Sequence, residues 1–147
     1  MNKLSIIIPC YNEEKTLLSV INEIEVFKDY KTEIIIVDDG SNDKTKDILK
    51  EINKENIKIF YHDRNYGKGK AIQTGIKEST GDIIIIQDAD LEYSPKDYPI
   101  LNRPFQESDA DVVYGSRFLG GSGYVRLHYY LHFIANKILT HFCNIFT

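Results

Sequence analysis

The chain has 147 residues, of which 42% are hydrophobic and 27% are charged, as expected for one soluble globular domain. Its net charge at pH 7 is −4 and no basic patch is evident, which argues against a nucleic acid as partner. Two cysteines are too few for a disulfide framework and predict reduced thiols in a cytoplasmic protein. We predict no signal peptide, because the apolar run Leu4 to Pro9 is too short and lacks a cleavage site. We predict no transmembrane helix, because no segment offers about 18 uncharged apolar residues.

Apolar runs alternate with stretches of helical spacing from the first residues onward. Runs rich in isoleucine and valine predict strands at 4–8, 33–37, 57–61, 83–86 and 112–114. Helices are predicted at 14–27, from a cap at Asn42 or Asp43 through Ile52, at 67–77, and from Ser94 toward Phe105. Pro99 and Pro104 predict that the last helix is short or broken. Strands with continuous apolar runs are buried on both faces, so the alternation predicts a doubly wound α/β fold with a parallel sheet.

Polar residues follow every predicted strand. Ligands of open parallel sheets bind at the carboxyl ends of the strands, so the site is expected there. The strand ends read Pro9-Cys10-Tyr11-Asn12-Glu13, Asp38-Asp39-Gly40-Ser41, His62-Asp63-Arg64-Asn65, Gln87-Asp88-Ala89-Asp90 and Gly115-Ser116-Arg117.

Asp88 and Asp90 are candidate metal ligands, and Glu92 could continue the row. Residues two apart on an extended chain point the same way, so both aspartates could bind one ion. Carboxylate oxygens suit Mg²⁺ or Mn²⁺, which would bridge diphosphate oxygens. The alternative is a solvated aspartate-rich turn, but the position directly after a buried strand favours the metal.

Two other strand ends are candidate nucleotide contacts. Asp38 or Asp39 could accept a hydrogen bond from a base or a ribose hydroxyl; the alternative is an Asx turn. Tyr11 and Glu13 could frame a nucleobase by stacking and hydrogen bonding. Their alternative is a helix start, with Asn12 as the N-cap.

Basic residues after two later strands are candidate phosphate contacts. Residues 64–71 supply glycines for close approach and cations, among them Lys70, but they form neither a dinucleotide fingerprint nor a Walker A loop. The alternative is a flexible basic loop. Arg117 could bind phosphate bidentately, or form a surface ion pair.

The segment 118–147 contains no acidic residue. Residues 124–146 predict a helix that is apolar around much of its circumference, and such a helix needs cover. We therefore expect either that the sequence is truncated at its C-terminus or that this helix meets a membrane surface or a partner, for instance a second copy of the chain.

These motifs resemble those of family 2 glycosyltransferases, most of all the branch of dolichyl-phosphate mannose synthase and polyprenyl-phosphate glycosyltransferases. The resemblance covers roughly residues 3–121 and rests on five motifs in order, at 9–14, 37–41, 65–69, 87–92 and 114–118. It implies a GT-A fold, that is, a Rossmann-like αβα sandwich with a mostly parallel sheet. It also implies a nucleoside-diphosphate sugar donor, such as a UDP- or GDP-sugar, with Mg²⁺ or Mn²⁺.

The same resemblance assigns roles to single residues. Pro9, Tyr11, Glu13 and Asp38 would line the nucleoside pocket, Asp88 and Asp90 would hold the metal, and Arg117 would meet phosphate. Glu92 stands where relatives often carry glutamine as a further metal contact. Asp90 and Arg117 are accordingly the predicted catalytic residues. Residues 1–121 would form the donor-binding core, and 122–147 would begin an incomplete acceptor or membrane-proximal region.

The resemblance implies inverting transfer of the sugar to an acceptor. A hydroxyl acceptor needs a general base, whereas no carboxylate follows Asp111. A polyprenyl phosphate (undecaprenyl or dolichyl) needs none, because its second pKa of about 6 leaves it anionic at neutral pH. The basic, aromatic tail suits the inner face of a membrane. The alternatives are transfer to a saccharide hydroxyl in cell-wall or surface polysaccharide synthesis, a nucleotidyltransferase, and a catalytically incomplete donor-binding module.

Overall fold

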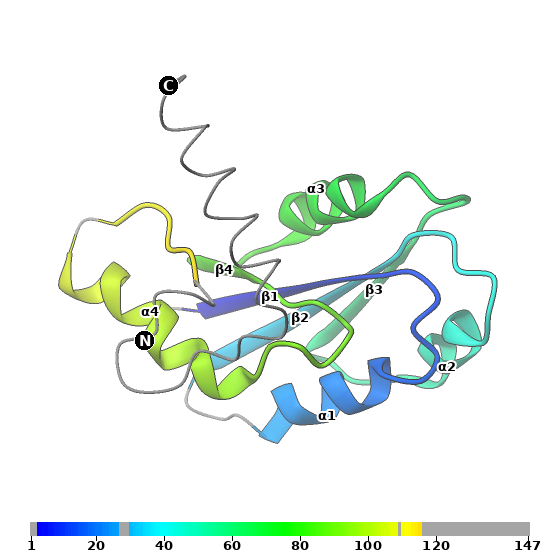
Figure 1. The fold of residues 1–147 in the computed structure, drawn as a ribbon, viewed down its shortest axis with the longest axis horizontal. Helices are drawn as coiled ribbons and strands as arrows, with labels where there is room; N and C mark the ends of the chain where they lie inside the picture. The colour runs from blue at the N-terminus through cyan, green and yellow to red at the C-terminus, as the bar shows by residue number, and fades with distance from the viewer. Residues whose placement is uncertain (1–2, 27–29, 109, 116–147) are drawn as a thin grey trace, which may run out of the picture. The chain divides into compact units, whose positions relative to one another are not determined.

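A computed structural model of the chain describes residues 3–26, 30–108 and 110–115 (Figure 1). The elements are β1 (Lys3–Cys10), α1 (Leu17–Val26), β2 (Lys31–Asp38), α2 (Thr45–Glu51), β3 (Ile57–Tyr61), α3 (Lys68–Glu78), β4 (Ile83–Ile86), the 3₁₀ turn η1 (Pro95–Asp97) and α4 (Tyr98–Glu107). The chain divides into two compact units, Met1–Ile100 and Leu101–Thr147. The sheet and the candidate site lie in the first unit.

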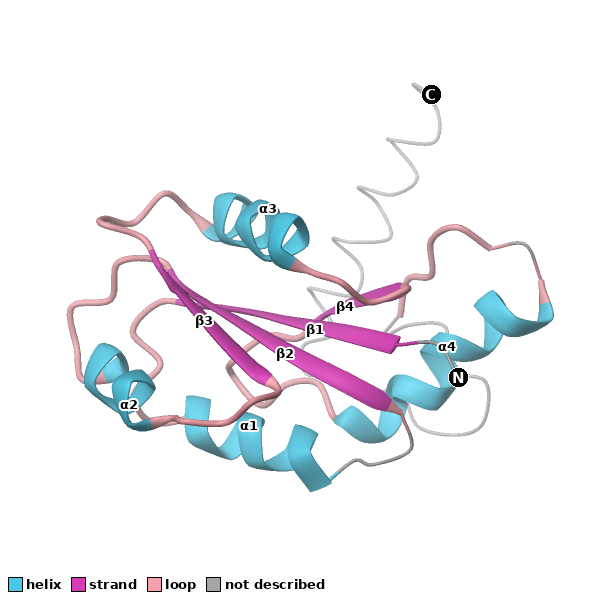
Figure 2. Cartoon of the chain, turned by 180° about the vertical axis from the view of Figure 1, so that it is seen from behind, coloured by secondary structure: helices cyan, strands magenta, loops and turns pink. Residues whose placement is uncertain are grey.

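The four strands form one parallel sheet in the order β3-β2-β1-β4. Helix α3 covers one face, and α1 and α2 lie on the other (Figures 1 and 2). The register pairs Cys10 with Asp38 and Asp38 with Tyr61, so β1, β2 and β3 end side by side. This arrangement confirms the predicted α/β class with a parallel sheet.

The core follows from the isoleucine and valine runs of β1 and β2. Ile7, Ile35 and Val37 are fully buried together with Ala71 of α3, and Phe60 packs against this cluster. Side chains on a strand alternate between its faces, so Ile6, Ile8, Ile34 and Ile36 fill the opposite face, and all four are fully buried. Burial on both faces holds the strand ends in fixed positions.

The predicted helices differ from the structure in their bounds, whereas two of the predicted strands match it. Residues 57–61 and 83–86 are strands as predicted, whereas the first helix begins at Leu17 instead of Glu14. A turn precedes it, in which the Glu13 carbonyl accepts the N–H groups of Thr16 (3.3 Å) and Leu17 (3.1 Å). Asn12, just before this turn, has a left-handed φ of 59°. The N-cap of α2 is Lys44, so neither Asn42 nor Asp43 takes the predicted cap position, although the Asp43 carboxylate accepts the Thr45 N–H at 2.9 Å.

The helix predicted from Ser94 is divided, as its prolines suggest. A short 3₁₀ turn whose N-cap is Ser94 precedes α4, which contains Pro104. Pro99 lies in the first turn of α4, where a missing N–H leaves no intrahelical bond unmade. No helix within the described ranges is long and apolar enough to cross a membrane.

The strand predicted at residues 112–114 is wrong. These residues adopt no regular structure, and Val112 and Tyr114 are 65% and 89% exposed. A three-residue apolar run specifies a strand only if a neighbouring strand pairs with it and its side chains are buried, and these side chains are not. Arg117, the helix predicted at 124–146 and the domain boundary predicted after residue 121 lie outside the described residues.

Candidate active site

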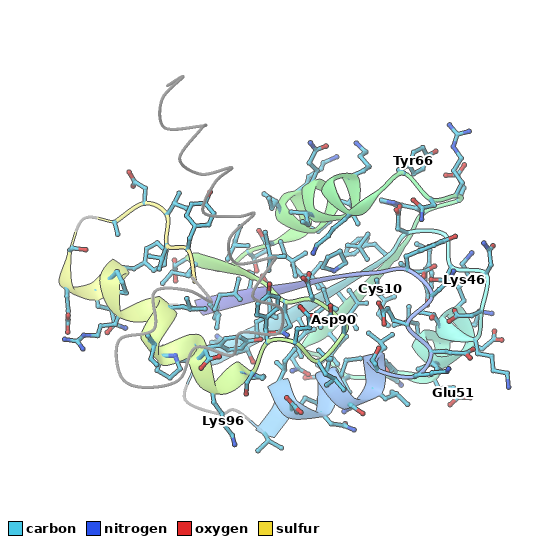
Figure 3. All side chains as sticks on the ribbon, viewed as in Figure 1. Cys10, Lys46, Glu51, Tyr66, Asp90 and Lys96 are labelled. Atoms are coloured by element: carbon cyan, nitrogen blue, oxygen red, sulfur yellow. The ribbon has the colours of Figure 1, made fainter. Side chains whose placement is uncertain are left out.

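A cavity of about 180 Å³ opens where β1, β2 and β4 end. Its lining comes from four separate segments of the sequence and comprises Pro9, Cys10, Tyr11, Glu13, Asp39, Lys68, Ala71, Asp88, Ala89 and Asp90. Figure 3 labels two of these residues, Cys10 at the end of β1 and Asp90 in the loop after β4. The fold therefore brings together Pro9, Tyr11, Glu13, Asp39, Asp88 and Asp90, all of which the sequence singled out.

The other predicted site residues that the structure describes, Asp38, Lys70 and Glu92, do not line this cavity. Asp38 is fully buried, and its carboxylate accepts the Ser41 N–H at 3.3 Å. Lys70 and Glu92 are exposed outside the lining. Lys68 takes the position expected of a lysine from this loop, and sequence reasoning did not single it out. Its signal was its place between two glycines in the basic segment 64–71.

Asp88 and Asp90 reach the cavity from a turn instead of an extended strand. β4 ends at Ile86, residues 89 and 90 form a turn, and Leu91 has a left-handed φ of 63°. The expected alternation along a strand is thus the wrong geometry for this pair. The Asp90 carboxylate accepts the Glu92 N–H at 3.1 Å, while Oδ1 of Asp88 lies 2.6 Å from Nζ of Lys68.

Gln87 holds the turn that carries the two aspartates. Its side-chain amide donates to the carbonyl oxygens of Asp88 (3.2 Å) and Tyr93 (3.1 Å), the two sides of the turn. Its own carbonyl oxygen accepts the hydroxyl of buried Tyr98 at 2.8 Å. In the sequence Gln87 stands out only as part of a strand end, whereas in the structure it fixes the backbone that carries Asp88 and Asp90.

Asp39 organises the opposite side of the cavity. Its carboxylate accepts the backbone N–H groups of Tyr66 (3.0 and 3.1 Å) and Gly67 (2.7 Å), and it lies 2.6 Å from Nδ1 of His62. Burial alone would raise the pKa of Asp39, but the contact with His62 and the two backbone N–H groups outweigh it and lower this pKa. Asp39 is therefore ionised at neutral pH and fixes the loop that starts α3.

The loop after β1 is tied to the loop after β2. Asn12 donates its N–H to Oγ of Ser41 (2.9 Å), and its side-chain oxygen accepts the Asn42 N–H (2.8 Å). The Asn12 side chain thus bridges two loops instead of capping a helix, and asparagine tolerates the left-handed φ better than most residues. The Glu13 N–H is bonded to Oγ1 of Thr45 at 2.9 Å. These bonds hold Tyr11 and Glu13 at the rim.

Cys10 is not set up as a nucleophile. Its thiol is buried at the end of β1 and donates to the carbonyl oxygen of Val37. Burial raises the pKa of Cys10 far above its usual value, and the charges of Asp38 and Glu13 raise it further. The thiol therefore stays protonated, whereas the thiolate is the reactive form of cysteine.

The charge of the cavity favours a cation. Its lining carries the carboxylates of Glu13, Asp39, Asp88 and Asp90 against the single ammonium of Lys68. Within the described residues no group of three His, Cys, Asp or Glu side chains could hold a metal by itself. Mg²⁺ commonly binds through one or two carboxylates, completed by substrate phosphates and water. The oxygen donors of Asp88 and Asp90 fit that pattern.

Comparison with known proteins yields one family. The profile described as "Glycosyl transferase family 2" matches residues 5–145. A dolichol-phosphate mannosyltransferase of Pyrococcus furiosus is 33% identical over 81% of this chain and 34% of its own length. A dolichyl-phosphate beta-glucosyltransferase of Trichomonas vaginalis is 35% identical over 78% of this chain and 40% of its own length.

A solved structure shares the fold. The mannosyltransferase PcManGT of Pyrobaculum calidifontis, in complex with GDP-Man and Mn²⁺, matches with a TM-score of 0.58 and 27% identity, over 65% of this chain and 30% of that one. The likeness confirms the predicted GT-A type of fold. The chain spans half or less of the length of the curated relatives it matches.

Proposed function

The chain belongs to glycosyl transferase family 2, and on this premise we propose that it forms the donor site of a metal-dependent glycosyltransferase. The donor would be a nucleoside-diphosphate sugar, such as a UDP- or GDP-sugar. The observation that carries the proposal is the acidic cavity at the strand ends, where Asp88 and Asp90 meet Tyr11 and Glu13. A pyrophosphate could not enter so acidic a cavity by itself, because like charges repel at short range.

A divalent cation resolves this repulsion. Asp88 and Asp90 would hold Mg²⁺ or Mn²⁺, and the cation would offset the charge of the leaving diphosphate. PcManGT, which shares the fold, contains GDP-Man together with Mn²⁺. Gln87 keeps the turn of Asp88 and Asp90 in one conformation, so little ordering would be needed on binding. Arg117, predicted to meet phosphate, and Glu92, predicted as a further ligand, remain predictions.

The nucleoside would bind at the rim on the β1 side. Tyr11 is 40% exposed there, and an exposed aromatic ring offers a face on which a base can stack. Glu13, fixed by its backbone bond to Thr45, would accept a base N–H. Asp39 already accepts several bonds from its own loop, so we assign it to positioning that loop. The assignments of Asp38 and Lys70 to the nucleotide site stay predictions.

For the acceptor we propose a polyprenyl phosphate at a membrane surface. Two similar proteins are named for transfer to dolichyl phosphate. A phosphate acceptor is already anionic and needs no general base, in keeping with the absence of carboxylates from residues 118–147. Product analysis with the full-length protein tests this step. Transfer to a saccharide hydroxyl but never to polyprenyl phosphate would overturn it.

The donor site is tested by thermal unfolding of the chain with UDP-, GDP- and dTDP-sugars, with and without Mn²⁺. A ligand at 100 times its Kd stabilises by about 2.7 kcal/mol, so the right donor should raise Tm only in the presence of the metal. Asp90→Asn should abolish the metal-dependent part of the shift. Asp97→Asn, which removes an exposed carboxylate outside the cavity, is the matched control and should keep it. An unchanged shift in Asp90→Asn would remove Asp90 from the site.

A further inference from the structure

Nζ of Lys68 lies 2.6 Å from Oδ1 of Asp88, and we propose that this ammonium holds the place of the divalent cation until the cation binds. The metal would then displace the ammonium, which would turn to the donor's diphosphate. The inference rests on the proposed function, since it places the metal on Asp88. It adds a residue, Lys68, that exchanges between two anionic partners.

The charge of the cavity gives the first reason. Among the described residues that line it, Lys68 is the one cation facing four carboxylates. Without a counter-ion, Asp88 and Asp90 would repel each other and their acidic neighbours. The ammonium on Asp88 lowers that repulsion while the donor is absent. Any cation that arrives must therefore compete with Lys68 for the same oxygen atom.

The exposure of the pair gives the second reason. The Lys68 side chain is 59% exposed and that of Asp88 is 21% exposed. Ion pairs exposed to this degree contribute a factor of about five or less to an equilibrium constant, because water screens them. A divalent cation shared with diphosphate oxygens can overcome so small a factor. The ion pair of Lys68 with Asp88 is thus strong enough to form without a metal and weak enough for a divalent cation to displace the lysine.

The backbone explains why the side chain can move alone. Lys68 is the first residue of α3, and the preceding Gly67 is held by the carboxylate of Asp39 through its N–H. The Gly67 carbonyl accepts the N–H groups of Lys70 (3.0 Å) and Ala71 (3.2 Å). With this backbone fixed, rotation about the side-chain bonds of Lys68 suffices to move its ammonium from Asp88 toward a phosphate in the same cavity.

The test is the binding of Mn²⁺ to the chain and to Lys68→Met, measured by calorimetry or by the electron spin resonance of free Mn²⁺. Methionine keeps the length of the side chain and removes its charge. Without nucleotide, we expect the variant to bind Mn²⁺ about three- to fivefold more tightly, because no ammonium competes. With saturating Mn²⁺, we expect the Kd of GDP or UDP to rise, because the ammonium no longer meets the diphosphate. The two changes have opposite signs.

Two further variants separate this exchange from simpler effects. Lys77→Met removes the same charge at the other end of α3 and should change both constants less than Lys68→Met does. Lys68→Arg keeps a cation and should keep the Mn²⁺ affinity close to that of the wild type. Thermal unfolding in the absence of ligands checks that each variant folds.

Each other outcome overturns the inference. Weaker Mn²⁺ binding in Lys68→Met would mean that the lysine orients Asp88 for the metal, and equal binding would mean that it does not compete. Neither of these two results for Lys68→Met would count against the proposed donor site, provided that the wild type binds Mn²⁺ and Asp90→Asn does not. A wild-type chain that binds no Mn²⁺, with or without GDP or UDP, would remove the donor site and this inference together.

Discussion

His62 connects Asp39 to helix α3. Its Nδ1 lies 2.6 Å from Oδ1 of Asp39, and its Nε2 lies 3.0 Å from Oγ1 of Thr74. The ring also meets Tyr66 edge-on, with the centroids 5.5 Å apart. Because the same carboxylate accepts the Tyr66 and Gly67 N–H groups, Asp39 joins the loop after β2 to the loop after β3. This connection fixes where α3 begins and therefore where Lys68 lies.

Asp39→Asn should weaken the connection between the loop after β2 and the loop after β3. The amide replaces one acceptor oxygen by a donor, which would then face the Tyr66 or Gly67 N–H or the ring of His62. An unsatisfied buried donor costs about 1–3 kcal/mol, so we expect the free energy of unfolding to fall by that amount. Urea unfolding at pH 7 measures it. Asp111→Asn, at an exposed aspartate, is the control and should be unchanged. A variant as stable as the wild type would mean that Asp39 does not hold the loop.

Gly40→Ala should disturb the same junction sterically. Gly40 has a φ of +73°, and a Cβ there would lie 2.5 Å from the carbonyl carbon of Arg64 and 2.8 Å from the Asn65 nitrogen. Backbone atoms cannot yield as a flexible side chain can, and the left-handed φ adds about 1–3 kcal/mol of strain. We expect a lower Tm in thermal unfolding, by more than that strain alone would produce.

The matched control for this change is Gly69→Ala. A Cβ at Gly69 meets nothing within 4 Å, and the residue lies inside α3. Alanine in a helix is favoured over glycine by about 0.5–1 kcal/mol, so this variant should be at least as stable as the wild type. An equal loss of Tm in Gly40→Ala and Gly69→Ala would show that the close approach of Gly40 to Arg64 does not contribute to stability.

The sequence predicted the strands because their signal is local. Uninterrupted isoleucine and valine runs predict strands buried on both faces, and β1 and β2 are buried in this way. The bounds of β3 and β4 match the prediction, but these two strands are only partly buried. The strand ends then had to converge, which is why most predicted lining residues lie together. Residues 112–114 failed because a short apolar run depends on a pairing partner, which the sequence does not reveal.

The choice between neighbouring residues was beyond the sequence. Asp38 and Asp39 are the same residue type at neighbouring positions, yet Asp38 is fully buried outside the cavity and Asp39 lines it. Lys68 and Lys70 lie in one helical turn, and only the position where α3 begins decides which of them reaches Asp88. Asp39 sets that position by a contact across 28 residues of sequence. Local patterns carry no information about such a contact.

Tyr98→Phe should weaken the support of the aspartate turn. The Tyr98 hydroxyl donates to Gln87, whose amide spans the turn from Asp88 to Tyr93. Removal of the hydroxyl leaves the buried Gln87 oxygen without this donor, at a cost of about 1–3 kcal/mol. We expect a lower Tm and, since the turn is less fixed, weaker Mn²⁺ binding.

The same substitution at an exposed tyrosine is the control for Tyr98→Phe. Tyr114 is 89% exposed, so Tyr114→Phe should change neither Tm nor the Mn²⁺ affinity. A loss of Tm in Tyr98→Phe with unaltered Mn²⁺ affinity would mean that Gln87 supports the fold but does not position the metal turn.

Glu33 ties the sheet together at the end opposite the cavity. Its buried carboxylate accepts hydrogen bonds from the Ser5 hydroxyl (2.6 Å) and the Thr80 N–H (2.6 Å), and it forms ion pairs with Lys3 (2.8 Å) and Lys58 (3.2 Å). Burial alone would raise the pKa of Glu33, but the bonds from Lys3, Ser5 and Thr80 outweigh it and hold this pKa well below its usual value. The ionised carboxylate therefore stabilises the fold.

Glu33→Gln should reveal this contribution through its dependence on pH. A carboxylate whose pKa is lower in the folded state stabilises fully above its unfolded pKa of about 4.3, and the stabilisation is lost as the pH falls through the folded pKa. In urea unfolding at pH 7, the free energy of unfolding of the wild type should therefore exceed that of the variant by about 2 kcal/mol. This difference should shrink progressively below about pH 4. Glu51→Gln, at an exposed glutamate that ends α2, should match the wild type at pH 7. A difference for Glu33→Gln that stayed constant from pH 7 to pH 3 would mean that the shape of the side chain, and not its charge, joins Lys3, Ser5 and Thr80.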